Sequence, residues 1–147
     1  MIIHIKELLN HKTTTELFEY FKEQLIDLYN QLSICEEIQE NKFIEFLQRS
    51  NVYLFVNESM KIIGAITALY ERKMIHNGGI ICHIEDFVIH EDYRNQGIGK
   101  RLMNYVIEDA KQKKCYKIIL DCNENMYNYY NKYGFESKNI QMSYYIE

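Results

Sequence analysis

Apolar side chains recur along this chain with two different periods. Between residues 14 and 32 they stand three or four positions apart, which predicts an amphipathic helix with one buried stripe. Residues 40–49 predict a second, shorter helix with the same period. The expected inward-facing side chains of these two helices are Leu17, Phe18, Phe21, Leu25, Leu28, Tyr29, Leu32, Phe43, Phe46 and Leu47.

From residue 52 onward the pattern becomes that of strands, and a polar turn at 57–60 makes the first two a hairpin. Residues 116–120 form a near-continuous apolar run, as in a strand that is covered on both faces. The predicted strands are 52–56, 61–70, 80–89, 116–120 and 141–146. The predicted later helices are 97–113 and 124–132, with Gly134 as the C-cap of the last helix.

The resulting order is two helices, three strands, a helix, a strand, a helix and a strand. This order predicts an α/β (α+β) fold, in which helices flank a mixed central sheet on both faces. The strand–helix–strand unit late in the chain should be parallel and right-handed. A length of 147 residues without a linker or repeat predicts a single domain over residues 1–147.

Composition narrows the class of protein. Apolar residues make up 47% of the chain, and a formal net charge of -4 argues against a general nucleic-acid binder. No apolar run approaches the roughly 20 residues of a membrane span, and the first residues do not have the pattern of a signal peptide. The four cysteines form no C-x-x-C pair, which favours reduced thiols and a cytoplasmic location.

The most informative segment joins an acidic strand to a glycine-containing turn. Glu85-Asp86-Phe87-Val88-Ile89 is followed by Arg94-Asn95-Gln96-Gly97-Ile98-Gly99-Lys100, and the predicted helix 97–113 begins at that turn. Glycines let a backbone approach an anion closely, and a helix start offers unpaired N–H groups. The combination predicts a pyrophosphate cradle beside acidic chemistry.

Two other glycine motifs fail by register. A P-loop needs a glycine where Arg94 stands and a Ser or Thr where Arg101 stands. A dinucleotide-binding fingerprint needs a third glycine at the position of Leu102. From these residues alone, a plain turn with glycines at a helix start remains the alternative.

The Arg-x-x-Gly-x-Gly turn resembles the coenzyme-binding motif of the GNAT N-acetyltransferases. Longer strings resemble one family among them, the glucosamine 6-phosphate N-acetyltransferases, over roughly residues 28–135. These strings are Cys115-Tyr116-Lys117-Ile118-Ile119-Leu120-Asp121-Cys122, Tyr129-Tyr130-Asn131-Lys132-Tyr133-Gly134-Phe135, Glu71-Arg72-Lys73-Met74-Ile75-His76 and His83-Ile84-Glu85-Asp86-Phe87-Val88.

The resemblance implies acetyl-coenzyme A (acetyl-CoA) as the co-substrate. Tyr130 would protonate the departing thiolate, and Asn125 would contact the coenzyme in place of an asparagine that the family has where this chain has Met126. Backbone groups of Phe87, Val88 and Ile89 would meet the acetyl carbonyl and the pantetheine arm. The pyrophosphate would lie on the backbone of Arg94, Asn95, Gln96, Gly97, Ile98, Gly99 and Lys100.

The resemblance also implies the amine-binding residues. Asp121 would orient and deprotonate the amine, and Glu85 and Asp86 would contact the amine and the sugar hydroxyls. On a regular strand Glu85 and Asp86 point to opposite faces, so both reach one ligand only with help from a bulge or a neighbouring strand. Lys117 would contact the phosphate and Ser33 would offer a hydroxyl. His76 and His83 lack metal-ligand spacing, and no metal is expected.

The implied reaction is acetyl transfer from acetyl-CoA to the 2-amino group of glucosamine 6-phosphate, by direct attack in a ternary complex, and its product feeds UDP-N-acetylglucosamine synthesis. A homodimer with crossing last strands is expected. One departure matters, because Tyr145 stands where the family has an arginine for the sugar phosphate, and no arginine follows Arg101. The alternatives are an acetyltransferase for another amine, such as a polyamine or a protein N-terminus, and a non-catalytic acyl-CoA sensor.

Overall fold

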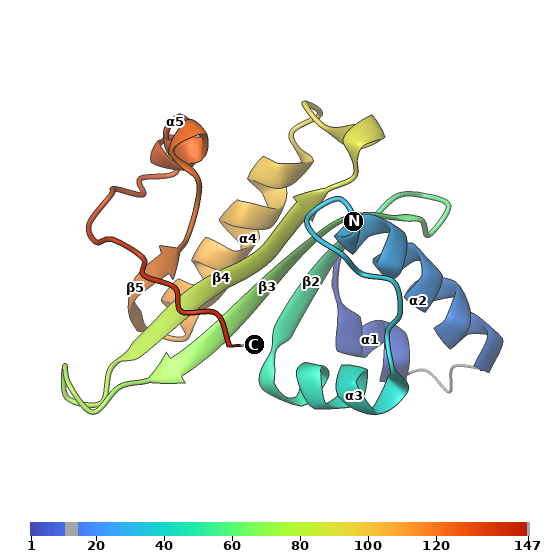
Figure 1. Ribbon diagram of the computed structural model, residues 1–147, viewed down its shortest axis with the longest axis horizontal. Helices are drawn as coiled ribbons and strands as arrows, with labels where there is room; N and C mark the ends of the chain where they lie inside the picture. Colours follow the sequence, from blue (N-terminus) through green and yellow to red (C-terminus); the bar gives the residue numbers. More distant parts are fainter. Residues whose placement is uncertain (11–14, 147) are drawn as a thin grey trace.

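A five-stranded sheet runs through the centre of the molecule (Figure 1). The computed structural model describes residues 1–10 and 15–146, with side chains described for residues 1–7 and 19–146. The strands lie in chain order and are β1 (Ile2–His4), β2 (Asn51–Val56), β3 (Ile62–Arg72), β4 (Ile80–Ile89) and β5 (Cys115–Leu120). The first four are antiparallel to their neighbours, whereas β4 and β5 are parallel.

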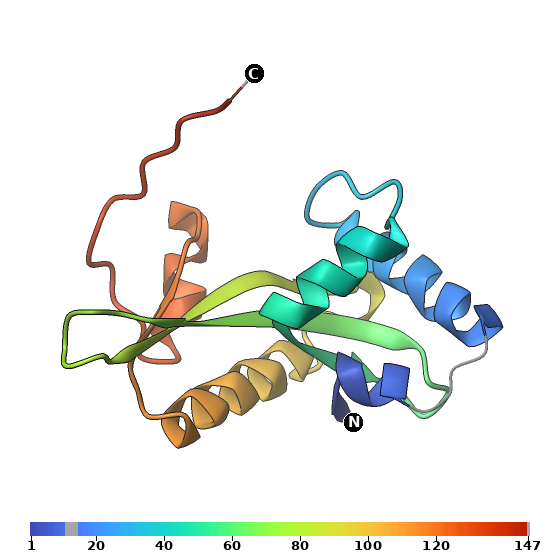
Figure 2. The same ribbon diagram turned by 90° about the horizontal axis from the view of Figure 1, so that it is seen from below.

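Helices pack on both faces of this sheet, as the order of elements predicts (Figure 2). The α-helices are α1 (Ile5–Asn10), α2 (Thr15–Tyr29), α3 (Glu40–Arg49), α4 (Ile98–Gln112) and α5 (Tyr127–Asn131), and short 3-10 turns span Glu91–Tyr93 and Glu124–Met126. The expected hairpin of β2 and β3 and the parallel β4–α4–β5 unit are both present. Gly134 has a φ of 88°, as a glycine that ends a helix requires.

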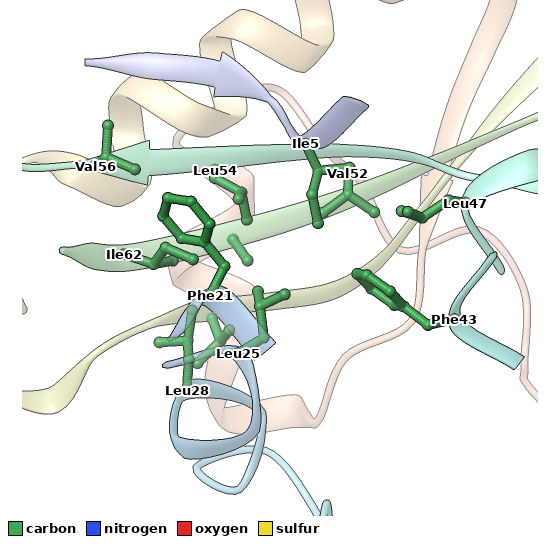
Figure 3. Packing of buried hydrophobic residues seen from close by; sticks show 12 residues of the cluster. Ile5, Phe21, Leu25, Leu28, Phe43, Leu47, Val52, Leu54, Val56 and Ile62 are labelled. Carbon is green, nitrogen blue, oxygen red and sulfur yellow. The ribbon is translucent and has the colours of Figure 1, made fainter. Parts of the chain in front are cut away.

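Two apolar layers hold the helices to the sheet. On one face, Phe21, Leu25 and Leu28 of α2 and Phe43 and Leu47 of α3 pack on β2 and β3 (Figure 3). On the other face, the buried side of α4 packs on β2, β3 and β4 through Ile98, Leu102, Met103, Val106 and Ala110. The periodic stripes in the sequence therefore become these two interfaces. The predicted inward positions Leu17 and Phe18 lie outside the described side chains.

The β5 edge of the sheet is less covered than the sequence suggests. The apolar run at 116–120 predicted burial on both faces, and this prediction is wrong. Tyr116 is 37% exposed, and no side chain of β5 is fully buried. The physical reason is that α2 and α3 lie over β2, β3 and the last part of β4, so neither of them covers β5.

The two ends of the chain also differ from the prediction. The pattern did not reveal β1 and α1, because each is too short to show a period. Residues 141–146, predicted as a closing strand, form no strand within this chain. They run past the open side of the sheet and away from the body (Figures 1 and 2). An extended segment becomes a strand only when a neighbouring edge satisfies its backbone groups, and here none does.

Candidate active site

A bulge in β4 brings Glu85 and Asp86 to the same face of the sheet. The β3–β4 register shifts between Ala65 and Thr67, and Asp86 has a φ of 45°. As a result, the Phe87 side chain packs in the apolar layer between the sheet and α4, whereas the Val88 side chain packs in the layer between the sheet and α2. The expectation of opposite faces on a regular strand therefore does not apply, because the extra residue resets the alternation.

Asp121 joins this pair from the neighbouring strand. The parallel register pairs Ile84 with Leu120, so the next residues, Glu85 and Asp121, come side by side at the end of β5. Burial raises the pKa of Glu85, and the negative charges of Asp86 and Asp121 raise it further. Burial also raises the pKa of Asp86. Three carboxylates thus share one face, and the surroundings of Glu85 and Asp86 favour the protonated forms of these two.

A cavity of about 410 Å³ opens beside Asp86. Its walls include Tyr29 and Ser33 at the end of α2, Lys42 on α3 and Asp86 itself. The loop that carries Ser33 is held in place by Asn30, whose amide donates to the Cys35 carbonyl and accepts from the Cys35 N–H, both at 2.8 Å. The structure therefore brings the predicted Ser33 and Asp86 to one cavity, although they are far apart in the sequence.

Lys117, predicted to contact the sugar phosphate, and the cations Arg72 and Lys73 differ in the contacts that they already make. Arg72 donates to the Gly78 carbonyl at 2.6 Å, and Lys73 Nζ lies 2.5 Å from Glu71 Oε1. Lys117 instead lies over the ring of Tyr116, 5.8 Å from its centroid, and forms no ion pair among the described residues. Lys117 is four residues before Asp121, so both side chains lie on the same face of the sheet. It is thus the cation best placed to meet an anion there.

The backbone of β4 continues beyond the end of β5. Pairing of the two strands stops at Ile84 and Leu120, whereas β4 extends to Ile89. The outer backbone edge of β4, which faces away from β3, therefore has no partner strand among the described residues at Phe87, Val88 and Ile89. A slot between diverging parallel strands can accept an extended ligand through its N–H and C=O groups.

The glycine turn lies directly after this slot. Arg94 donates through Nε to the Ile89 carbonyl at 3.0 Å, which ties the turn to the end of β4. Gly97 has a φ of 77° and open space where a Cβ would be, and no side chain caps the first turn of α4. The first-turn N–H groups, from Ile98 to Lys100, therefore have no side-chain cap from the described residues, which fits the diphosphate of a coenzyme. Asn95 and Gln96 complete the turn, and Asn95 also has a positive φ, 62°.

Tyr130 lies on α5, partly buried against the α4 layer. Its ring contacts those of Tyr129 and Phe135 edge to face. Burial raises the pKa of Tyr130, with smaller contributions from Cys122 and Tyr133, so its hydroxyl keeps its proton at neutral pH. Asn125, predicted to contact the coenzyme, lies in the 3-10 turn before α5 and is exposed.

Tyr129 lies beside the predicted cradle and was assigned no role from the sequence. Its hydroxyl lies against Gly99 in the first turn of α4, and its ring is 6.5 Å from that of Phe87. The chain has 13 tyrosines, and no motif or spacing in the sequence sets Tyr129 apart from the others.

Known proteins match this arrangement. The model of the acetyltransferase (GNAT) family matches residues 11–135. The chain belongs to the GNAT acetyltransferase family. Among curated relatives of this GNAT domain, a glucosamine 6-phosphate N-acetyltransferase of Dictyostelium discoideum is 34% identical over 87% of the chain and 75% of the relative. A probable glucosamine 6-phosphate N-acetyltransferase of Oryza sativa is 32% identical over 82% and 79%.

Solved structures agree with this family assignment. The crystal structure of glucosamine-6-phosphate N-acetyltransferase from Arabidopsis thaliana superposes on the GNAT domain with a TM-score of 0.80 and 28% identity, covering 88% of this chain and 93% of that one. An acetyltransferase from Trypanosoma brucei gives 0.81 and 26%, covering 87% and 94%. The resemblance inferred from the sequence strings is confirmed.

The described residues, 1–10 and 15–146, contain neither a membrane-spanning helix nor a metal-binding cluster. None of the helices there is both long enough and apolar enough to span a membrane. The same ranges contain no group of three or more His, Cys, Asp or Glu side chains arranged to hold a metal ion.

Proposed function

We propose that this acetyltransferase moves the acetyl group of acetyl-CoA to the 2-amino group of glucosamine 6-phosphate. The observation that carries the proposal is the convergence of Glu85, Asp86 and Asp121 beside the β4 slot and the α4 cradle. The curated relatives support the choice of substrate, since two of them share at least 32% identity over most of the chain.

The carboxylates would act on the amine of the sugar. An ammonium group must lose a proton before it can attack a thioester, and a carboxylate within hydrogen-bond reach can accept that proton. We assign Asp121 as the group that orients and deprotonates the amine, with Glu85 and Asp86 holding the amine and the sugar hydroxyls. Ser33, in the cavity beside Asp86, supplies a further hydroxyl, and Lys117 meets the phosphate.

Tyr130 would supply the proton at the other end of the reaction. A thiolate leaves more easily when a hydroxyl donates to its sulfur, and Tyr130 stays protonated because burial raises its pKa. Acetyl-CoA, when bound, supplies the activated acetyl group. The chain's own contribution is to hold it, through the backbone of Phe87 to Ile89 and of the 94–100 turn, with Asn125 at its edge.

A homodimer is part of the proposal. Apolar side chains of the C-terminal tail are at least 88% exposed, namely Ile140, Met142, Tyr144, Tyr145 and Ile146. So much exposed apolar surface in one segment is typical of an interface. We propose that the tail forms the predicted closing strand on a second copy, within a single-domain protein of the cytoplasm. Its product would feed UDP-N-acetylglucosamine synthesis.

One observation favours a second candidate function. The chain has no arginine after Arg101, and Tyr145 is at the aligned position of a family arginine that binds the sugar phosphate. Lysine is a poorer bidentate ligand for phosphate. The second candidate is therefore acetyl transfer to an amine without a phosphate, such as a polyamine.

Thiol release from acetyl-CoA tests both candidates. The purified protein is incubated with glucosamine 6-phosphate, with unphosphorylated glucosamine and with spermidine, and free coenzyme A is measured. Turnover confined to the phosphorylated sugar supports the first proposal. Turnover on spermidine alone would support the second candidate and contradict the first. Coenzyme binding without turnover on any amine would favour an acyl-CoA sensor.

A further inference from the structure

The hydroxyl of Tyr129 lies against the first turn of α4. A Cβ atom built on Gly99 would be 2.6 Å from the Tyr129 hydroxyl oxygen and 3.3 Å from Cζ of Phe87. Since real Cβ atoms do not approach other heavy atoms that closely, the missing side chain of Gly99 is what admits the hydroxyl. The hydroxyl therefore stands beside the uncapped N–H groups of the cradle.

The hydroxyl of Tyr129 has one side-chain neighbour of its own kind. Its oxygen lies 3.4 Å from that of Tyr133, a long contact in which either hydroxyl can donate, and the two rings meet edge to face. No other hydrogen bond to the Tyr129 hydroxyl is present among the described residues, so its O–H is available to a ligand when Tyr133 donates to it. Contacts with the rings of Tyr130 and Phe87 restrict the side chain, so little conformational freedom is left to lose when a ligand binds.

We propose that the Tyr129 hydroxyl donates a hydrogen bond to the pyrophosphate of coenzyme A, as a side-chain addition to the backbone cradle of α4. The inference rests on the proposed use of acetyl-CoA. A phosphate oxygen is the acceptor that fits, because a bond to a charged acceptor is stronger than a neutral one. The Tyr133–Tyr129–phosphate series would also polarise each bond in turn.

Met126 lies three residues before Tyr129, and so on the same side of this short helical segment, and its thioether has no proton to donate. Tyr129 therefore supplies the hydrogen-bond donor that Met126 cannot supply. If Tyr129 only filled space, its ring would suffice and its hydroxyl would be dispensable for binding.

Calorimetric titration with coenzyme A tests the role of the hydroxyl directly, without any turnover. Tyr129→Phe keeps the ring, and the expected result is a Kd about tenfold higher than that of the unchanged protein. Tyr133→Phe should raise the Kd by a smaller factor, about twofold to threefold. Tyr127→Phe is the matched control, because Tyr127 lies on the same helix and is exposed, and its Kd should not change.

The outcomes separate the inference from the proposed function. If the unchanged protein binds coenzyme A and Tyr129→Phe binds it equally well, the inference fails and the function stands. If the unchanged protein binds no coenzyme A, both fail. Repeating the titration with pantetheine, which lacks the pyrophosphate, should remove the difference between Tyr129→Phe and the unchanged protein. A difference that persists with pantetheine would overturn the assignment to pyrophosphate.

A second pair of variants tests the position of the hydroxyl. Gly99→Ala should lower the Tm, because the new methyl group meets the Tyr129 oxygen. Adding Tyr129→Phe removes that oxygen, so the double variant should recover part of the lost Tm. A double variant no more stable than Gly99→Ala alone would show that the hydroxyl is not against Gly99, and the inference would fall.

Discussion

Asp86 adopts a left-handed backbone conformation, and this places its carboxylate on the same face of the sheet as that of Glu85, the residue before it. A φ of 45° is costly for residues with a side chain, and Asp and Asn bear it better than most. Burial and mutual repulsion of the two carboxylates add to that cost. The bulge is thus a local strain that assembles the acidic site.

Replacing Asp86 with Asn should separate activity from stability. Asn tolerates the same backbone, so Asp86→Asn should fold, yet lose at least about tenfold in kcat/KM because a carboxylate is gone. Since burial raises the pKa of Asp86, its ionised form destabilises the folded protein above that pKa. The Tm of Asp86→Asn at pH 8 should therefore exceed that of the unchanged protein. A Tm that fell as far as that of Asp86→Val, which the left-handed backbone disfavours, would contradict this account.

The pH dependence of activity should report the acidic cluster. Raised carboxyl pKa values place the acid limb of kcat/KM above the ordinary range of about 4. Removing the charge of Asp121 lowers the pKa of Glu85, so any residual activity of Asp121→Asn should have its acid limb at lower pH. Rates measured from pH 4 to 9 test this. An unchanged midpoint would show that Glu85 does not control the limb and that Asp121 is not the base.

Tyr130→Phe should lower kcat by about 10²-fold with little change in KM, because the hydroxyl acts on the leaving sulfur and not on the bound sugar. Steady-state rates with both substrates varied measure the two constants. Tyr105→Phe is a suitable control, since Tyr105 is a half-exposed tyrosine on α4 that packs against Tyr53, away from the site. Full kcat in Tyr130→Phe would remove the proposed acid.

Asp109 anchors α4 to the sheet and should govern stability at low pH. Its carboxylate accepts a hydrogen bond from Tyr53 at 2.7 Å and further bonds from Tyr70 and Lys113. Burial acts to raise the pKa of Asp109, but the bonds from Lys113, Tyr70 and Tyr53 outweigh it and hold the pKa below its usual value. The group therefore adds stability above the ordinary aspartate pKa and loses it as pH falls through the lowered one.

Urea unfolding of Asp109→Asn at neutral pH should give a free energy lower by about 1–3 kcal/mol. The gap to the unchanged protein should narrow toward pH 3, where the native carboxylate takes up its proton. A gap that stays constant over this range would show that the charge of Asp109 is not what stabilises the contact. Asp109→Asn should not change the Kd for coenzyme A, since Asp109 lies near the C-terminal end of α4 and the cradle lies at its start.

Removal of the C-terminal tail should dissociate the proposed dimer. Light scattering on the full chain should give about twice the 17.8 kDa of one chain, and deletion from residue 137 should give the single-chain mass. Met142→Ser with Tyr144→Ser is a milder variant that keeps the length of the tail. A full chain that is monomeric at concentrations of about 10 µM would contradict the dimer. The deletion should also lower activity, because Gln141 donates to Asp121 at 2.9 Å.

Much of this architecture follows from local sequence signals. The helical stripes of α2, α3 and α4, the β2–β3 hairpin and the turn at Arg94 to Gly99 each depend on residues a few positions apart, so their patterns can be read directly. The acidic strand and the helix start after it are adjacent in the chain, which is why the cradle and Glu85 were predictable. The family resemblance supplied the roles of Asp121 and Tyr130, which no pattern by itself distinguishes.

Tertiary structure decided what depends on distant contacts. The bulge at Asp86 arises from a change in pairing with β3, and Ser33 reaches Asp86 only because α2 packs across the sheet. Tyr129 meets Gly99 through the packing of α5 against α4, 30 residues away in the numbering. The tail at 141–146 has the apolar content of a strand but pairs with no strand edge of the described residues. Backbone hydrogen bonds and side-chain packing between remote segments set these features, and no local period encodes them.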